Sequence, residues 1–392
     1  MSNSKTVWAI ERHTLAKHRI LREYLKAWFP ILSHQSAKLH GTSNVIRYIE
    51  GFAGPGIYTG GEPGSPIIAL KVVNEHTHKL PTPVAFDFVE LDKARHARLE
   101  QEIQSLAKQA SGRRHVASVG AHQDDCRVVI PGLIEKYRKS GFGPAMFFLD
   151  QFGYSGIPIE LVSLILSLGE CEIFSYFNWD HLNRFIMDEN KSAGLSAAFG
   201  SEDWRQCVGE PPERRVKVFL DLYKAALREK GLAKYVLHFA MHDENDKLLN
   251  WLFFCTNHLD GVEEMKRAME KVDSTGACRF SERLADGQLA FLAEMDDAWL
   301  ANELEARLRG RSLTVEEIRK YVLVETPSRL HKKALAALEM SNRLHVPNPH
   351  PGRRIGTFGD GGMIVAFRPD PSKGASASQR DGIDGSLFEN LK

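Results

Sequence analysis

The chain has 392 residues, of which 43% are apolar and 26% are charged, and this ordinary composition excludes a disordered or fibrous protein. Its length favours two or three domains. The 51 Lys and Arg residues nearly balance the 50 Asp and Glu residues, which argues against a uniformly basic nucleic-acid-binding surface.

The cysteines and the apolar stretches bound the cellular context. The five cysteines stand far apart, so no C-x-x-C pair exists to form a zinc site, and we expect no metal. An odd number of cysteines favours a reduced protein over a disulfide scaffold. The N-terminal segment lacks the apolar core of a signal peptide, and the longest apolar stretch, Leu161–Leu168, is too short to cross a bilayer. We therefore expect a cytoplasmic protein that does not bind membranes.

The first two thirds of the chain alternate between β-like and helical runs. Residues 14–28 have a helical apolar stripe, which Pro30 is predicted to end. The alternation that follows predicts a parallel sheet covered on both faces. The predicted strands are residues 45–50, 84–91, 115–119, 145–150 and 172–177, and the predicted helices are residues 65–73, 93–106, 128–139 and 159–168. Residues 235–241 and 248–256 are predicted to form an antiparallel pair that closes one edge of this sheet.

The pattern becomes mainly helical after residue 272. Three helices, at residues 288–308, 314–324 and 328–341, precede a hairpin rich in Pro, Gly and Arg at 347–362 and a short strand at 363–367. This order is typical of a winged-helix module. The predicted domains are an α/β domain with the N-terminal helix (1–275), a helical linker (276–310), a winged-helix-like module (311–368) and a disordered tail (369–392).

The clearest chemical signal is a glycine-rich loop after the first strand. Glycines let the backbone approach a ligand closely, and the next helix offers free N–H groups. The loop lacks the Lys-Ser/Thr of a P-loop and departs from the G-x-G-x-x-G spacing of a dinucleotide site. The alternative is a tight turn without a ligand. The candidate cofactor-binding residues of the loop are Glu50, Gly51, Phe52, Ala53, Gly54 and Gly56.

Acidic residues follow the next two strands. Glu90 ends the second strand, where α/β folds commonly bind ribose hydroxyls, and Asp124 follows the third, placed to meet an exocyclic amine. Each acid alone is more often a helix cap, and Asp92 before the helix at 93 resembles one. A glycine loop and two acids at three successive strand ends favour a nucleoside-containing ligand.

This arrangement resembles the class I S-adenosylmethionine-dependent methyltransferases, with a Rossmann-like doubly wound fold. The resemblance implies S-adenosyl-L-methionine as cofactor, with its methionine part at the loop, its ribose at Glu90 and its adenine at Asp124. More narrowly, residues 48–56, 64–66 and 150–158 resemble the three-Cys-motif partner protein (TcmP) family over residues 10–275. That resemblance implies a three-Cys-motif protein as partner. Two departures are Gln151 in place of a proline and the long distance from the loop to Glu90.

The residues after the fourth and fifth strands suggest a reaction. In amine-directed nucleic-acid methyltransferases, a polar side chain here accepts a hydrogen bond from the target amine and an aromatic ring stacks on the base. We therefore expect Asp150 to orient an amine, Phe152 to form a stacking wall and Asn178 to line the same cleft. The alternative is that Asp150 caps the following helical region and Phe152 belongs to the core. Methyl transfer depends mainly on alignment and needs no dedicated nucleophile.

The C-terminal module is locally basic. Residues 311–368 contain ten Lys and Arg against five acids. A basic helix with a basic wing is typical of duplex-binding modules, although a solvated helix face or a protein-docking module is the alternative. The candidate nucleic-acid-binding residues are Arg329, Lys332, Lys333, Arg353 and Arg354.

The sequence therefore favours a methyltransferase that acts on an amine of a nucleic acid, with the basic module contacting phosphates. A second hypothesis is a non-catalytic partner subunit that binds S-adenosylmethionine or nucleic acid. A third is methylation of a protein or a small molecule.

Overall fold

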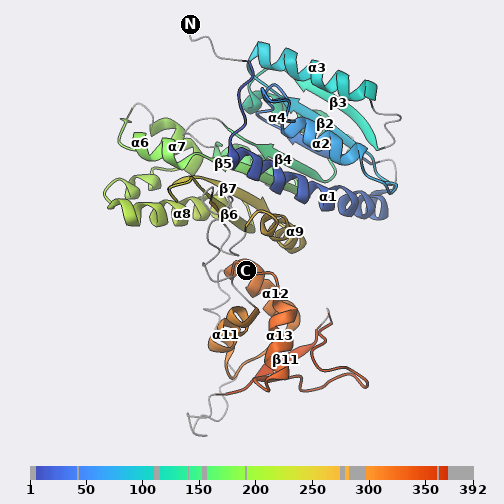
Figure 1. Ribbon diagram of the computed structural model, residues 1–392, viewed down its shortest axis with the longest axis vertical. Coiled ribbons are helices and arrows are strands. Elements are labelled where there is room, and N and C mark those ends of the chain that lie inside the picture. Colours follow the sequence, from blue (N-terminus) through green and yellow to red (C-terminus); the bar gives the residue numbers. More distant parts are fainter. Residues whose placement is uncertain are drawn as a thin grey trace. The chain divides into compact units, whose positions relative to one another are not determined.

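The computed structural model describes residues 6–41, 44–109, 115–139, 141–151, 157–189, 192–273, 279–281, 297–359 and 362–369. The chain divides into two compact units (Figure 1). The first comprises Met1–Glu294 with Leu323–Arg329, and the second comprises Met295–Val322 with Leu330–Lys392.

The first unit is built on an eight-stranded sheet in the order β3-β2-β1-β4-β5-β7-β6-β8. Its strands run parallel except β7, which is antiparallel to both of its neighbours. The mixed α/β fold class expected from the sequence, with a large and mostly parallel central sheet, is confirmed. The strands are β1 (Ile46–Glu50), β2 (Val84–Val89), β3 (Val116–His122), β4 (Ala145–Leu149), β5 (Cys171–Phe177), β6 (Tyr235–His242), β7 (Leu248–Thr256) and β8 (Arg279–Ser281).

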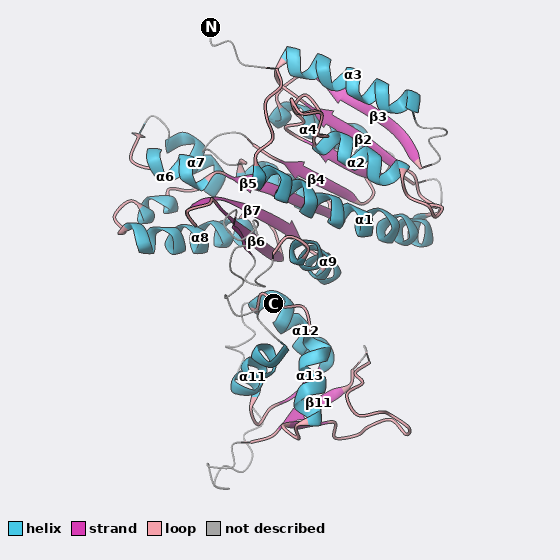
Figure 2. Cartoon of the chain, in the orientation of Figure 1, coloured by secondary structure: helices cyan, strands magenta, loops and turns pink. Residues whose placement is uncertain are grey.

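Helices cover both faces of the sheet (Figure 2). Every residue of the central strands β1 and β4 is buried, as expected for a parallel sheet with a core on each side. One core is formed with α1 (Arg12–His40), α2 (Ser65–Asn74), α3 (Lys93–Gln109) and α9 (Leu259–Glu270). The other is formed with α4 (Cys126–Arg138), α5 (Ile159–Leu166), α6 (Trp179–Phe185), α7 (Ser192–Phe199), the 3-10 helix η2 (Asp203–Cys207) and α8 (Pro212–Glu229).

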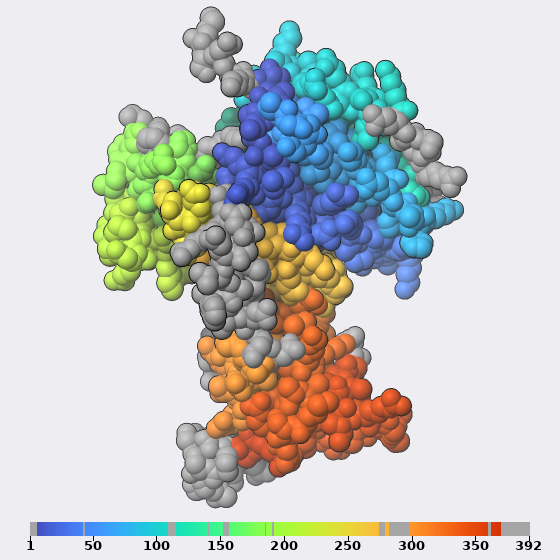
Figure 3. Space-filling model, in the orientation of Figure 1, coloured from blue at the N-terminus to red at the C-terminus, as the bar shows by residue number. Residues whose placement is uncertain are grey.

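The N-terminal helix does not end at Pro30, so that prediction is wrong. α1 continues through the proline to His40. A proline inside a helix removes one backbone hydrogen bond, but contacts with the segment just before β2 hold the second half of α1 in place. The Ser33 hydroxyl donates to the carbonyl oxygen of Thr82 at 2.8 Å and accepts from the Thr82 N–H at 2.9 Å. α1 and α2 contact each other, and their dark and lighter blue surfaces lie side by side in Figure 3.

The two late strands pair as predicted but do not close the sheet. β6 and β7 are antiparallel, and β7 lies between β5 and β6. The outer neighbour of β6 is β8, a three-residue strand that the sequence analysis did not predict. Its side chains alternate too briefly to give a strand pattern.

In its described residues the second unit combines three helices with a three-stranded antiparallel sheet of order β10-β11-β9, and the last three residues of α12 belong to the first unit. Its core includes Leu304, Val322, Leu335 and Val365. The first predicted helix is observed from residue 297, since its expected start at 288 lies outside the described residues. In chain order the elements are α11 (Asp297–Leu308), β9 (Ser312–Thr314), α12 (Val315–Glu325), α13 (His331–Met340), β10 (Leu344–His345) and β11 (Ile364–Phe367).

None of the described helices combines the length and the apolar character that a bilayer span requires.

Candidate functional site

The glycine loop is tied to both strands that flank β1. The Gly51 N–H donates to the carbonyl oxygen of Phe148 at the end of β4, and the Ala53 N–H donates to that of Val89 at the end of β2, both at 2.9 Å. The loop therefore crosses the carboxyl ends of three adjacent strands, which is where ligands bind in open α/β sheets.

The three glycines of the loop serve different purposes. A Cβ on Gly51 would lie 2.8 Å from Leu149 Cδ2, and one on Gly56 would lie 2.9 Å from Leu99 Cδ1. Neighbouring side chains therefore leave no room for a larger residue at either position. Gly54 and Gly56 also have positive φ angles, of 64° and 76°. A Cβ on Gly54 would meet no atom within 4 Å. The space above Gly54 is therefore open, while its backbone conformation still favours glycine.

Glu90 is bound to this loop. It is only 7% exposed, and its carboxylate accepts the Gly54 N–H through Oε2 and the Asp92 N–H through Oε1, both at 2.8 Å. Each carboxylate oxygen can accept a second hydrogen bond. Glu90 can therefore hold the loop in place and still receive a ligand hydroxyl.

A cavity of about 390 Å³ opens beside the loop. This volume falls within the range of small-molecule sites. Four of the predicted cofactor residues, Gly51, Phe52, Glu90 and Asp124, line it, and Ala53, Gly54 and Gly56 belong to the same loop. Its other lining residues are Leu91, Arg95, Asp125, Cys126, Arg127, Gln151, Ile157, Pro158, Leu161, Gly194 and Ala197.

Asp124 and Asp125 divide their tasks. The Asp125 side chain caps α4 by accepting the Arg127 N–H at 2.8 Å, and it pairs with the Arg127 guanidinium, which lowers the pKa of Asp125. Asp124 is exposed and accepts the Asp125 N–H at 2.7 Å. The cap is therefore Asp125, and Asp124 is left to face the cavity.

Glu50 lies behind the loop and is fully buried. Burial raises the pKa of its carboxyl well above the ordinary value. The carboxyl accepts from the Ser65 hydroxyl at 2.5 Å and from the Tyr48 hydroxyl at 3.1 Å. The bond to Ser65 joins the end of β1 to the start of α2, so Glu50 fixes the two ends of the segment that contains the glycine loop.

A partly buried ion pair stands at the end of β4. Lys17, on α1, pairs through Nζ with Oδ2 of Asp150, and their side chains are 7% and 14% exposed. The Lys17 Nζ also lies 4.8 Å from the ring centre of Tyr176. Burial lowers the pKa of the adjacent His18 to about 3, and Lys17 contributes to this shift. The pairing uses one oxygen of Asp150 and leaves Oδ1 for another donor.

The remaining predicted catalytic residues have different outcomes. Asn178 follows β5 and caps α6, because its Oδ1 accepts the His181 N–H at 2.9 Å. Gln151, which replaces the expected proline, lines the cavity. Phe152 lies outside the described residues.

The five basic candidates are not alike. Arg353 pairs through both terminal nitrogens with Glu339 at 2.7 Å, and its side chain is only 7% exposed, so it fastens its loop to α13. Arg329 belongs to the first unit and pairs with Glu270 at 2.8 Å. Lys333 and Arg354 are exposed, and Lys332 is half-buried.

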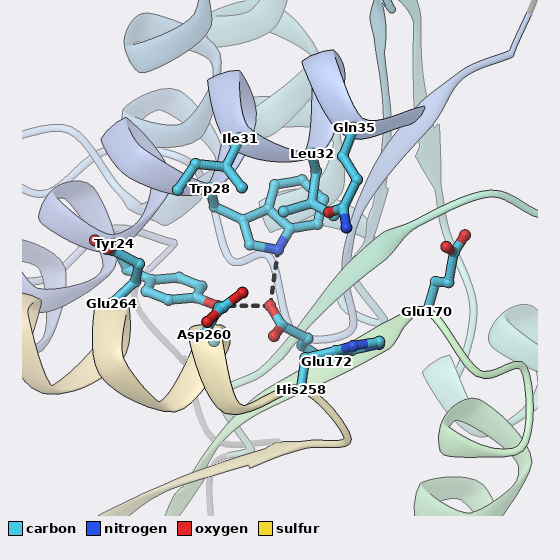
Figure 4. A pocket seen from close by; sticks show the side chains of 11 residues that line it. Tyr24, Trp28, Ile31, Leu32, Gln35, Glu170, Glu172, His258, Asp260 and Glu264 are labelled. Atoms are coloured by element: carbon cyan, nitrogen blue, oxygen red, sulfur yellow. Dashed lines mark hydrogen bonds between the residues drawn. The ribbon is translucent and has the colours of Figure 1, made fainter. Parts of the chain in front are cut away.

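A second, smaller hollow of about 90 Å³ lies at the amino end of β5 (Figure 4). Glu172, near the start of that strand, accepts from the Tyr24 hydroxyl at 2.6 Å and from Trp28 Nε1 at 2.7 Å. It also accepts from the Thr256 hydroxyl at 2.8 Å. Glu172 therefore anchors α1 at the edge of the sheet opposite the glycine loop.

No protein-family model and no curated protein matches this chain. Remote likenesses exist among solved structures. Human methyltransferase 10 domain containing protein has 11% identity and a TM-score of 0.30 over 61% of this chain and 82% of that one. The delta-N METTL16 MTase domain has 10% identity and a TM-score of 0.30 over 61% and 83%. Trm1 from Pyrococcus horikoshii, in complex with S-adenosyl-L-methionine, has 10% identity and a TM-score of 0.33 over 89% and 91%. Likenesses this remote carry no argument about function, which rests on the site itself.

Proposed function

We propose that the first unit is a methyltransferase domain and that its 390 Å³ cavity binds S-adenosyl-L-methionine. The observation that carries this proposal is the meeting of the glycine loop, Glu90 and Asp124 in one cavity at the carboxyl ends of β1, β2 and β3. Such a cavity suits a ligand that combines a ribose, a base with an exocyclic amine and an amino-acid tail.

Each part of the cofactor has a corresponding residue. Phe52 and the open backbone at Gly54 would face the methionine part. The remaining acceptor positions of Glu90 would receive the ribose hydroxyls, and Asp124 would accept from the adenine amine. Glu50, which is buried and favours its protonated form, would support the loop without contacting the cofactor.

The transferred methyl group would emerge near Asp150. Transfer from a sulfonium requires a nucleophile aligned in a site from which water is excluded. Oδ1 of Asp150 would accept a hydrogen bond from a target amine, and the ion pair with Lys17 would fix the orientation of the carboxylate. In this proposal Phe152 remains the expected stacking wall, and Asn178 shapes the adjacent strand end as a helix cap.

We propose a nucleic acid as the substrate and a winged-helix role for the second unit. The order of helices and strands from α11 to β11 supports this, as do the exposed side chains of Lys333 and Arg354. Arg353 would act indirectly by holding the loop that carries Arg354. Phosphate contacts from such a module would offset the cost of extracting a base from the duplex.

A non-catalytic role is the second candidate, and the Lys17–Asp150 pair favours it. The Lys17 ammonium already occupies one oxygen of the carboxylate that would orient a substrate amine. In that case the chain would bind S-adenosylmethionine as the partner subunit of a three-Cys-motif protein. Transfer of the methyl group to a protein or a small molecule is a further alternative.

Calorimetry with S-adenosylmethionine is the first test, and the absence of measurable binding would refute the cofactor assignment. Transfer of a tritiated methyl group to DNA, RNA or proteins of a cell extract then separates the enzyme from the partner subunit. We expect Asp150→Asn to bind the cofactor but to lose transfer. Asp221→Asn, at an exposed residue of α8, is the matched control. Transfer unaffected by Asp150→Asn would remove Asp150 from the reaction.

A further inference from the structure

Arg95 is a cation of the cavity that sequence reasoning did not select. It lies in the first turn of α3 and lines the cavity beside Glu90. Its guanidinium carbon stands 5.1 Å from the ring centre of Trp8. Its Nε is buried and has no hydrogen-bond partner. The Arg98 Nε shares this property, but the Arg98 guanidinium pairs with Glu102. Arg95 has no such ion pair in the described part of the chain, and buried polar groups are generally satisfied, so a ligand group would complete its bonding.

Three acids, Glu90, Asp124 and Asp125, line the cavity together with Arg95, and none of them pairs with it. Glu90 accepts two backbone N–H groups, and Asp125 pairs with Arg127. Within the described part of the chain, no ion pair to Arg95 is formed. A partly buried guanidinium without a counter-charge is unfavourable, and an anionic group would compensate it.

Arg95 lies on the face of α3 that packs against the glycine loop. One turn after Arg95, Leu99 closes the space above Gly56, so this face of α3 packs against the loop. The guanidinium also lies over the Trp8 ring. A planar, singly charged carboxylate matches a guanidinium held in this way. A phosphate is less suitable because Glu90 and Asp124 line the same cavity and would repel its higher charge.

We propose that Arg95 binds the carboxylate of an amino-acid group at the glycine-loop end of the cavity. This inference rests on the proposed function, since S-adenosylmethionine and its product S-adenosylhomocysteine both carry such a carboxylate. Arg95 thereby determines specificity, because it distinguishes these compounds from nucleosides that lack the amino-acid group.

The test compares two ligands. S-adenosylhomocysteine has the carboxylate, and 5′-methylthioadenosine has the same adenosine and sulfur without it. We expect Arg95→Gln to weaken S-adenosylhomocysteine binding on the order of 10–100-fold in calorimetry, as for the loss of a charged hydrogen bond. Binding of 5′-methylthioadenosine should stay within about threefold, which also shows that the variant is folded. Arg95→Lys, which keeps the charge, should recover part of the loss.

Arg98→Gln is the matched control. Arg98 lies on the same helix, and its guanidinium pairs with Glu102 at 2.6 Å. This variant should bind both ligands as the unchanged protein does. The inference is overturned if Arg95→Gln weakens both ligands equally or neither of them. If the unchanged protein binds neither ligand, the proposed function itself fails and the role of Arg95 fails with it.

Discussion

Replacing Glu50 by Gln tests the electrostatics beneath the glycine loop. Glu50 is fully buried, and its pKa is raised well above the ordinary value of 4.5, mainly by burial. The folded protein therefore retains a proton that the unfolded chain releases above pH 4.5. Consequently the free energy of unfolding of the unchanged protein falls as the pH rises from 4.5 towards the pKa of the folded state. The slope is about 1.36 kcal/mol per pH unit.

Gln has nearly the same shape as the protonated carboxyl and does not titrate. Relative to the unchanged protein, Glu50→Gln should therefore gain stability as the pH rises above 4.5, by about 1.4 kcal/mol for each pH unit up to the pKa of the folded state. Urea unfolding at pH 5, 6 and 7 measures this difference. Glu75→Gln is the control, because the Glu75 side chain is 58% exposed and its variant should differ by a constant amount. A difference between Glu50→Gln and the unchanged protein that stays constant with pH would refute a buried, protonated Glu50.

Substitutions at three further positions, Lys17, His18 and Gly56, test other parts of the site. Lys17→Met should lower stability by about 3 kcal/mol, because it leaves the Asp150 carboxylate without its partner. In thermal unfolding, adding Asp150→Asn should restore most of this loss. Equal stability of Lys17→Met and the unchanged protein would contradict the prediction. The pKa of His18 is lowered to about 3 in the folded protein, so the unfolded chain takes up a proton below pH 6.5 that the folded protein does not. As the pH falls from 6 to 4, the unchanged protein should therefore lose about 1.4 kcal/mol of stability per pH unit relative to His18→Asn. Urea unfolding that shows the same pH dependence for both proteins would contradict this. Gly56→Ala should lower stability by at least about 1 kcal/mol through its positive φ and its approach to Leu99, and an unchanged melting temperature would exclude that strain.

The sheet was largely predictable because its signals are local. The buried run at Ile46–Glu50 and the one at Ala145–Leu149 begin and end within one residue of their predicted limits. The segment between β5 and β6 was not assigned, although Phe219, Tyr223 and Leu227 of α8 have helical spacing. Pro30 misled the prediction because local propensity opposes a helix there, whereas the contact of Ser33 with Thr82 comes from packing.

The polar partners of the candidate site were less accessible to sequence reasoning. The glycine loop and Glu90 are recognisable from residue type and position. Lys17 pairs with a residue 133 positions away, and nothing in an amphipathic helix marks one lysine as buried. Arg353 was counted as a basic surface residue because its pairing with Glu339 is visible only in three dimensions.

Helix α1 is held by side-chain contacts at both the amino and the carboxyl ends of the central strands. Glu172 fastens Tyr24 and Trp28 at one end, and Lys17 reaches Asp150 at the other. Seven residues, or about 10 Å of helix, separate Lys17 from Tyr24. Because the helix between these contacts is rigid, the position of Lys17 beside Asp150 depends on how Tyr24 and Trp28 are held at Glu172.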